Sequence, residues 1–147
     1  MTLKDKLLAN MKEALKSKDS LRLNTIRSVI SAIKNQEIDL RRELQEEEIL
    51  SVVTREGKKR KEASALFKQG GRTDLVEKED QELAILQDYL PEQVSEEELR
   101  KRIQEVIAET GAEGMKDFGK IMKVLVPEFK GKADNSVIKD LAGEFLN

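Results

Sequence analysis

Five lysines and two glycines follow one another closely near the end of the chain, and these residue types could bind an anionic partner. They are Lys116, Gly119, Lys120, Lys123, Lys130, Gly131 and Lys132. Between Met115 and Lys132 only Asp117 and Glu128 oppose the lysines, so the segment carries a net charge of +3. Lysine ammonium groups attract phosphates, and a residue without a side chain lets a partner's backbone approach closely. The segment is therefore a candidate nucleic-acid interface. The alternative is a solubilising surface with a turn at Gly131.

A second basic run lies in the middle of the chain. It contains Arg55, Lys58, Lys59, Arg60 and Lys61. Glu56 is the one acid between these residues, so the run carries a net charge of +4. Phosphate contacts by Arg55, Lys58, Lys59 and Lys61 are one interpretation, and a solvated helix face is the other.

Arg60 differs from its neighbours in the direction it faces. At 100° per residue it falls within the apolar stripe of the helix expected here, and Glu37 falls within the apolar stripe of the preceding helix. Charged groups on a core-facing stripe are usually paired. We therefore predict a structural ion pair between Arg60 and Glu37. Gly57 lies on the same stripe as Arg60, and we expect another helix to approach closely there, because glycine is otherwise unfavourable inside a helix.

The composition excludes several kinds of active site. The chain has no histidine and no cysteine, which removes serine–histidine triads, thiol nucleophiles and ordinary zinc sites. The segment Gly70-Gly71-Arg72-Thr73 lacks the spacing and the lysine of a phosphate-binding loop. Acidic runs at 46–48 and 96–98 stand where helices should begin, and acids there complement the helix dipole. We expect no catalytic residue, no metal and no cofactor.

Apolar residues recur with the helical period along nearly the whole chain, and no alternating strand pattern occurs. Helices are predicted over residues 2–17, 20–38, 46–69, 74–90, 95–109 and 115–126, with a seventh after Asp134. An Asp74–Glu77 capping box should begin the fourth helix, and Pro127 should end the sixth. Pro91 is the best boundary between domains. We expect an all-α fold, with a helical bundle or hairpin over residues 1–90 and a small three-helix unit over residues 91–147.

Charge and hydropathy bear on location. The 147 residues carry a net charge of −2, so any nucleic-acid binding must come from a local basic surface. The first residues lack the apolar core of a signal peptide, and no apolar run reaches the ~18 residues of a membrane span. From these features we expect a cytoplasmic protein without a membrane partner.

Three blocks of sequence carry a resemblance to a known family. They are Arg22–Lys34 with Glu37-Ile38-Asp39, Gly71–Leu75 continuing through Tyr89–Leu99, and Met115–Met122 with Lys130–Asp134. On these blocks the chain resembles the YqeY-like proteins of the GatB/YqeY family. Tyr-Leu-Pro at 89–91 and Gly-Lys-Ala-Asp at 131–134 are the more specific parts. The chain departs from the family by having Phe118 where methionine is common, which is a packing change.

The resemblance implies an all-helical fold in two parts, the second similar to the tail of the B subunit of the tRNA-dependent amidotransferase. That tail is thought to engage tRNA, so tRNA is an expected partner, with the amidotransferase or another protein as the alternative. Carbon–nitrogen ligase activity with glutamine as amido donor could be exerted only in trans, because the catalytic domains are not in this chain. Only five aromatic residues occur, so we expect recognition of RNA shape and backbone rather than base stacking.

Overall fold

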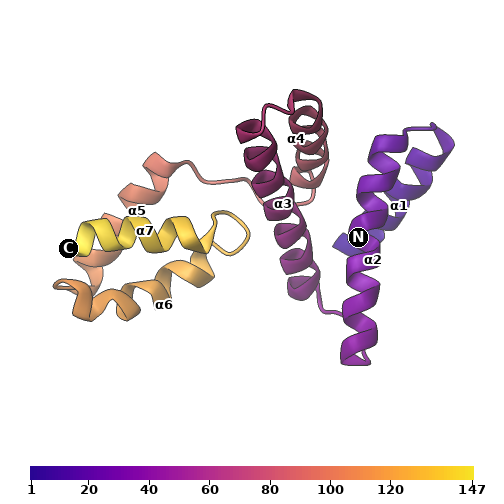
Figure 1. The fold of residues 1–147 in the computed structure, drawn as a ribbon. Helices are drawn as coiled ribbons and strands as arrows, with labels where there is room; N and C mark the ends of the chain where they lie inside the picture. Colours follow the sequence, from indigo (N-terminus) through magenta and orange to yellow (C-terminus); the bar gives the residue numbers. More distant parts are fainter. The chain divides into compact units, whose positions relative to one another are not determined.

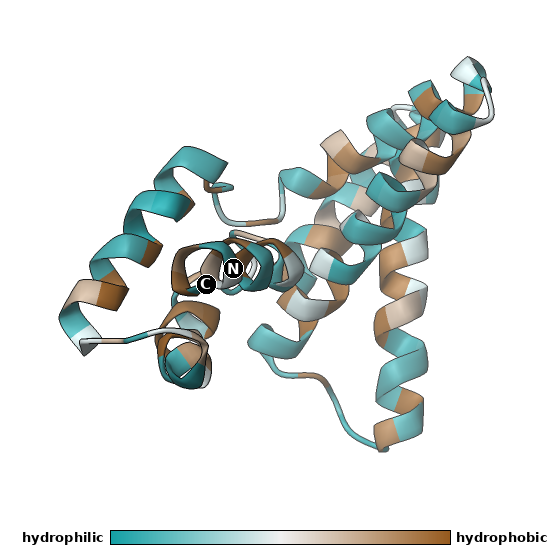
Figure 2. Cartoon of the chain, turned by 60° about the vertical axis from the view of Figure 1, so that its left-hand side comes forward, coloured by the Kyte–Doolittle hydropathy of each residue, from teal (hydrophilic) through white to brown (hydrophobic).

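The computed structural model describes residues 1–147, and its regular structure is entirely helical (Figure 1). Seven α-helices and one short 3-10 helix follow one another, and no strand is present. This confirms the predicted all-α class. The chain divides into two compact units, residues 1–90 (unit 1) and residues 91–147 (unit 2). Hydrophilic and hydrophobic residues recur in short intervals along the helices, as is typical of amphipathic helices (Figure 2).

Unit 1 contains two helical hairpins. The first is α1 (Leu3–Lys16) with α2 (Ser20–Leu40), and the second is α3 (Glu46–Gln69) with α4 (Thr73–Gln87). Their apolar stripes form one core, whose largest fully buried side chains are Leu7, Ile26, Val29, Ile33, Val52, Val53 and Leu86. Tyr89 lies in this core, and its hydroxyl accepts a hydrogen bond of 2.7 Å from Asn10 Nδ2 in α1. The tyrosine therefore joins the end of the second hairpin to the middle of α1 in the first hairpin.

Local sequence explains where these helices begin and end. Thr2 and Asp5 form a capping box at the start of α1. Asp19 accepts a hydrogen bond from Arg22 N at 3.1 Å and begins α2. At the end of α3, Gly71 has φ +70°, and Arg72 N donates to Phe67 O at 2.9 Å. This is the Schellman arrangement, which favours glycine at that position.

Two predicted boundaries of α4 are wrong. The helix begins at Thr73, and Asp74 lies within its first turn, 3.5 Å from Arg72 Nε, instead of acting as the cap. The helix ends at Gln87 and not at residue 90, because the bond from Tyr89 N to Leu86 O spans only three residues. The residue before a proline avoids the α conformation, so the approach to Pro91 ends the helix early.

Unit 2 contains α5 (Glu96–Thr110), the 3-10 helix η1 (Met115–Asp117), α6 (Phe118–Glu128) and α7 (Asn135–Leu146). Their buried residues form a second core. Ser95 Oγ accepts from Glu98 N at 3.2 Å at the start of α5. The prediction that Pro127 ends α6 is wrong, since Pro127 lies inside the last turn. There its missing N–H removes a single helical bond, and Phe129 N still donates to Leu125 O at 3.0 Å.

Candidate nucleic-acid interface

Three of the candidate lysines of unit 2 lie along η1 and α6. Lys116 belongs to η1, and Lys120 and Lys123 belong to α6. All three are exposed. Lys120 and Lys123 are three residues apart and so lie on the same side of the helix. The opposite side of α6 buries Ile121 and Leu125 in the core, which turns the lysines to solvent.

The other two lysines lie in the turn that follows α6. Lys132 N donates to Phe129 O at 2.9 Å, and Gly131, the third residue of this turn, has φ +77°. A positive φ at that position favours glycine, so the conformation of the turn is sufficient to explain the glycine at position 131. The turn is also tied to the segment before α5. Gln93 Nε2 donates to Gly131 O at 2.8 Å, and Val94 N donates to Lys132 O at 3.0 Å. The backbone that carries Lys130 and Lys132 is thus fixed, while both side chains are exposed.

The acids nearest these lysines are held by other groups. Glu128 binds Arg102 of α5 through both carboxylate oxygens, at 2.7 and 2.9 Å. These hydrogen bonds lower the pKa of Glu128 and raise that of Arg102. Asp117 accepts from Glu113 N at 2.7 Å. Lys120 and Lys123 form no ion pair, and Lys116 makes one long contact of 3.9 Å with the exposed Glu113. The ammonium groups of Lys120 and Lys123 are therefore not neutralised by an acid of the chain.

Gly119 is an exposed glycine of α6 beside Lys120. A Cβ atom built on it would meet nothing within 4 Å, so packing inside the chain does not require glycine there. The backbone beside the lysines is accordingly open to a partner. Below, we call Lys116, Gly119, Lys120, Lys123, Lys130, Gly131 and Lys132 the lysine surface.

The basic run of α3 is more engaged with its own chain. Arg55, Lys58, Lys59 and Lys61 are exposed. However, Arg55 Nη2 donates to Gln36 Oε1 at 3.3 Å, and Lys59 Nζ lies 3.8 Å from Glu56 Oε2. The four cations also point in two directions around the helix. Arg55 and Lys59 are about one turn apart and lie on the same side of α3, whereas Lys61 lies on another side. The run does not form a single charged face.

The predicted ion pair between Arg60 and Glu37 is wrong. Arg60 Nη1 binds Glu56 Oε2 at 2.9 Å, its Nη2 donates to Ser28 Oγ at 2.8 Å, and its Nε lies 3.5 Å from Glu82 Oε2. Arg60 and Glu37 do face helical interfaces, but α2 and α3 run antiparallel. Arg60 therefore meets the first half of α2 at Ser28, and Glu37 lies nine residues further along, a rise of about 13 Å.

Glu37 instead organises the connection between α2 and α3. Its Oε2 accepts from Leu44 N at 2.9 Å and pairs with Lys4 Nζ at 3.3 Å. The backbone hydrogen bond from Leu44, together with Lys4, lowers the pKa of the Glu37 carboxyl. This residue ties the loop and the first helix to the end of α2.

Two charged residues were missed by the sequence reasoning. Arg102 was missed because the glutamates that bind it lie on two different helices, α5 and α6, and the sequence does not show that these helices meet there. Glu56 is buried, and the rotation that placed Arg60 on the apolar stripe places Glu56 about 20° from Ile49. The same helical pattern could have identified it.

Among the described residues, no group of three or more acids could hold a metal ion. None of the helices combines the length and the hydropathy needed to cross a membrane.

Comparison with known proteins identifies the family. Residues 4–146 match the family described as Yqey-like protein. The chain belongs to the YqeY-like family. Almost the whole chain is covered, so both units are part of the family domain.

The curated relatives are fungal proteins called Altered inheritance of mitochondria protein 41, mitochondrial. The protein of Kluyveromyces lactis is 38% identical over 134 residues, covering 84% of this chain and 72% of the relative. Those of Vanderwaltozyma polyspora and Candida glabrata are 32% and 30% identical, covering 90% and 96% of this chain and 76% and 82% of each relative. These names point to mitochondria and correct the expectation of a cytoplasmic protein.

Proposed function

We propose that this YqeY-like chain is a helical accessory module that binds the backbone of folded RNA, with tRNA as the expected partner, through its lysine surface. The observation that carries the proposal is that Lys120 and Lys123 are exposed and form no ion pair, while the two acids of the segment are bound to other groups. Glu128 is occupied by Arg102, and Asp117 by a backbone N–H. Phosphates can therefore approach Lys120 and Lys123 without competition from an internal partner.

Backbone recognition suits this surface better than base recognition. The chain has four phenylalanines and one tyrosine. Tyr89 and Phe129 are buried, and Phe118 packs against the core of unit 2. Base stacking needs exposed aromatic rings, whereas backbone contacts need cations on a fixed support. The resemblance of residues 91–147 to the amidotransferase tail supports tRNA as the folded RNA. A contribution to transamidation would then consist of binding, because the chain offers no assembled catalytic group.

The test is binding of fluorescent tRNA to the full chain, measured by anisotropy at several salt concentrations. Because the relatives are named as mitochondrial proteins, mitochondrial tRNA is compared with total tRNA and with a random duplex RNA. The double variant Lys120→Ala/Lys123→Ala should weaken binding to every RNA and lower the salt slope by about 2, since each lost phosphate contact removes about 1.

The matched control is Lys101→Ala/Lys139→Ala. It removes two exposed lysines of the same unit from α5 and α7 and leaves the lysine surface intact. Equal losses in the two double variants would mean that net charge, and not this surface, governs binding. Absence of salt-sensitive binding would overturn the proposal and favour the protein-interaction alternative.

A further inference from the structure

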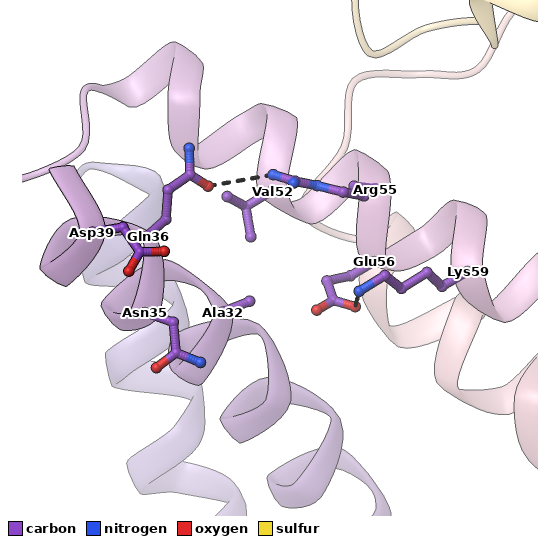
Figure 3. Close-up of a pocket in the computed structure, with 8 residues that line it drawn as sticks. All are labelled: Ala32, Asn35, Gln36, Asp39, Val52, Arg55, Glu56 and Lys59. Atoms are coloured by element: carbon purple, nitrogen blue, oxygen red, sulfur yellow. Dashed lines mark hydrogen bonds and ion pairs between the residues drawn. The ribbon is translucent and has the colours of Figure 1, made fainter.

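A hollow of about 240 Å³ opens between α2 and α3 in unit 1 (Figure 3). Each helix contributes four residues at the same spacing of three, four and seven positions. They are Ala32, Asn35, Gln36 and Asp39 from α2, and Val52, Arg55, Glu56 and Lys59 from α3. This spacing is that of one helix face, so two whole faces meet across the hollow. Most of the groups on these faces are polar or charged, which is unusual where two antiparallel helices meet.

Hydrogen bonds fix the separation of the helices on both sides of the hollow. Towards the α2–α3 loop, Arg55 donates to Gln36 at 3.3 Å. Towards the other end, Arg60 donates to Ser28 at 2.8 Å. The short side chain of Ala32 leaves the space between them open. The hollow is therefore built into the helix pair and does not depend on a loop.

Glu56 presents a buried carboxylate to this hollow. The residue is 7% exposed. Its Oε2 binds Arg60 Nη1 at 2.9 Å and lies 3.8 Å from Lys59 Nζ. The other carboxylate oxygen, Oε1, points across the hollow towards α2 and has no donor within the chain (Figure 3). Arg60 Nε is the one fully buried side-chain atom of the chain without a hydrogen-bond partner, so Oε1 of Glu56 is reached by solvent through the hollow. An occupant that replaces water there keeps the carboxylate hydrogen-bonded only if it offers an N–H or O–H group.

The remaining charges limit what that occupant can be. Asp39 adds a second carboxylate, while Lys59 and Arg55 add two cations on the α3 side. The hollow is thus close to neutral but carries both signs of charge. A simple cation would be repelled by Lys59 and Arg55, and a phosphate would be repelled by Glu56 and Asp39. A molecule with one positive and one negative group satisfies both sets of residues with charge-assisted hydrogen bonds.

We propose that this hollow binds a small zwitterion, namely a free α-amino acid. The ammonium group donates to Glu56 Oε1, and the carboxylate accepts from Lys59. The volume, below the range of pockets for drug-sized ligands, matches a molecule of this size. The site belongs to unit 1 alone, so it goes beyond the proposed RNA binding and is independent of it.

The test uses the isotopically labelled full chain and follows backbone amide signals during titration. L-Alanine and L-glutamine are the zwitterions. Ethylamine supplies the ammonium group alone, propionate supplies the carboxylate alone, and inorganic phosphate is a different anion. We expect both amino acids to shift the amides of residues 32–39 and 52–59 in a saturable manner. We expect ethylamine, propionate and phosphate to bind at least about tenfold more weakly.

Two variants with matched controls locate the binding. Ala32→Leu fills the hollow, and Ser31→Leu places the same side chain on the exposed face of α2. Lys59→Met removes the partner of the ligand carboxylate, and Lys61→Met removes an exposed lysine outside the hollow. Ala32→Leu and Lys59→Met should each lose at least about tenfold in affinity for the amino acids, and the two controls should bind as wild type.

Three results overturn the proposal. The first is no saturable shift by either amino acid, which would mean that water alone occupies the hollow. The second is equal binding of ethylamine, propionate or phosphate. The third is amino-acid binding that survives both Ala32→Leu and Lys59→Met, which would place it elsewhere on the chain.

Discussion

Each unit contains an arginine bound to several glutamates, and the two clusters differ mainly in burial. In unit 1, the side chain of Arg60 is 11% exposed, and the side chains of its partners Glu56 and Glu82 are 10% and 15% exposed. In unit 2, Arg102 is 27% exposed, and its partners Glu105, Glu109 and Glu128 are 38% to 60% exposed. The same chemistry therefore has different consequences. Water can replace a lost partner of Arg102, whereas it cannot readily reach the groups around Arg60.

The positions of the two clusters follow this difference. The Arg60 cluster joins three helices of unit 1, since Ser28 lies in α2, Glu56 in α3 and Glu82 in α4. It fixes how the two hairpins meet and forms one side of the α2–α3 hollow. The Arg102 cluster lies at the surface and keeps Glu128 occupied beside the lysine surface. Its main effect is on the electrostatics of unit 2.

The largest expected effect comes from breaking the buried cluster. Arg60→Met removes the cation that Glu56 and Glu82 share and leaves Glu56 only the exposed Lys59, 3.8 Å away. We expect unit 1 to lose about 3 kcal/mol of unfolding free energy. The fluorescence of Tyr89 reports this directly, because the chain has one tyrosine and no tryptophan, and Tyr89 is buried in unit 1. Urea unfolding followed by this signal gives the loss.

Arg102→Met is the matched variant in unit 2, followed by circular dichroism. We expect only a small decrease in stability, and one that shrinks further at high salt. The double variant Arg60→Met/Glu56→Met should recover part of the loss, because it removes both charges together. A loss in Arg102→Met as large as that in Arg60→Met would show that burial does not separate the clusters.

A stabilising change is expected at Gly57. The α4 region does approach this glycine, but an added Cβ would lie 3.6 Å from Leu83 Cδ1, which is ordinary contact. Gly57→Ala should therefore raise the stability of unit 1 by up to about 1 kcal/mol, the helix-propensity difference. Tyr89 fluorescence in urea measures it. If the variant is destabilised, the packing of α3 against α4 is tighter than the structure indicates.

Gly119 in α6 is a helical glycine of unit 2 that can be compared with Gly57 in unit 1. Gly119 faces open space, so an alanine there is free of contacts within the chain. In Gly119→Ala, any loss of RNA binding without a loss of stability would assign the glycine to the lysine surface. At Gly57 we expect the same change to alter stability and to leave RNA binding unchanged.

Helical periodicity was sufficient to predict the all-α class and the core faces. Ile26, Ile33 and Leu86 are buried as their spacing requires. Periodicity gives the direction of a side chain around its helix, and for that reason Arg60 and Glu37 were both correctly placed at helical interfaces. It does not give the position along a neighbouring helix. The pairing of Arg60 with Ser28, Glu56 and Glu82 depends on the antiparallel packing of α2 with α3 and on the position of α4.

The two candidate sites differ in the same respect. The lysine surface lies on one short segment, so its residues could be identified from the sequence, and exposure of α6 was predictable from Ile121 and Leu125 opposite. The α2–α3 hollow combines residues from two helices. Its existence depends on the separation set by the Arg55–Gln36 and Arg60–Ser28 hydrogen bonds, which no local pattern encodes.

The smallest effect is expected from an exposed pair with a large pKa shift. Arg42 binds Glu48 at 2.7 and 2.9 Å and, with the backbone N–H of Gln45, lowers the pKa of Glu48 to about 2. A lowered pKa in the folded state stabilises the protein at neutral pH, and this contribution is lost as pH falls from about 5 towards 2. The stability difference between wild type and Glu48→Gln should therefore narrow over that range, as measured by Tyr89 fluorescence. A Glu48 pKa near 4.5 in an NMR titration of the carboxyl would contradict this.

Arg42→Met should raise the pKa of Glu48 only part of the way, because the hydrogen bond from Gln45 remains. High salt should also raise the pKa of Glu48 only part of the way, since it screens the charge of Arg42 and leaves the hydrogen bond from Gln45 nearly unchanged.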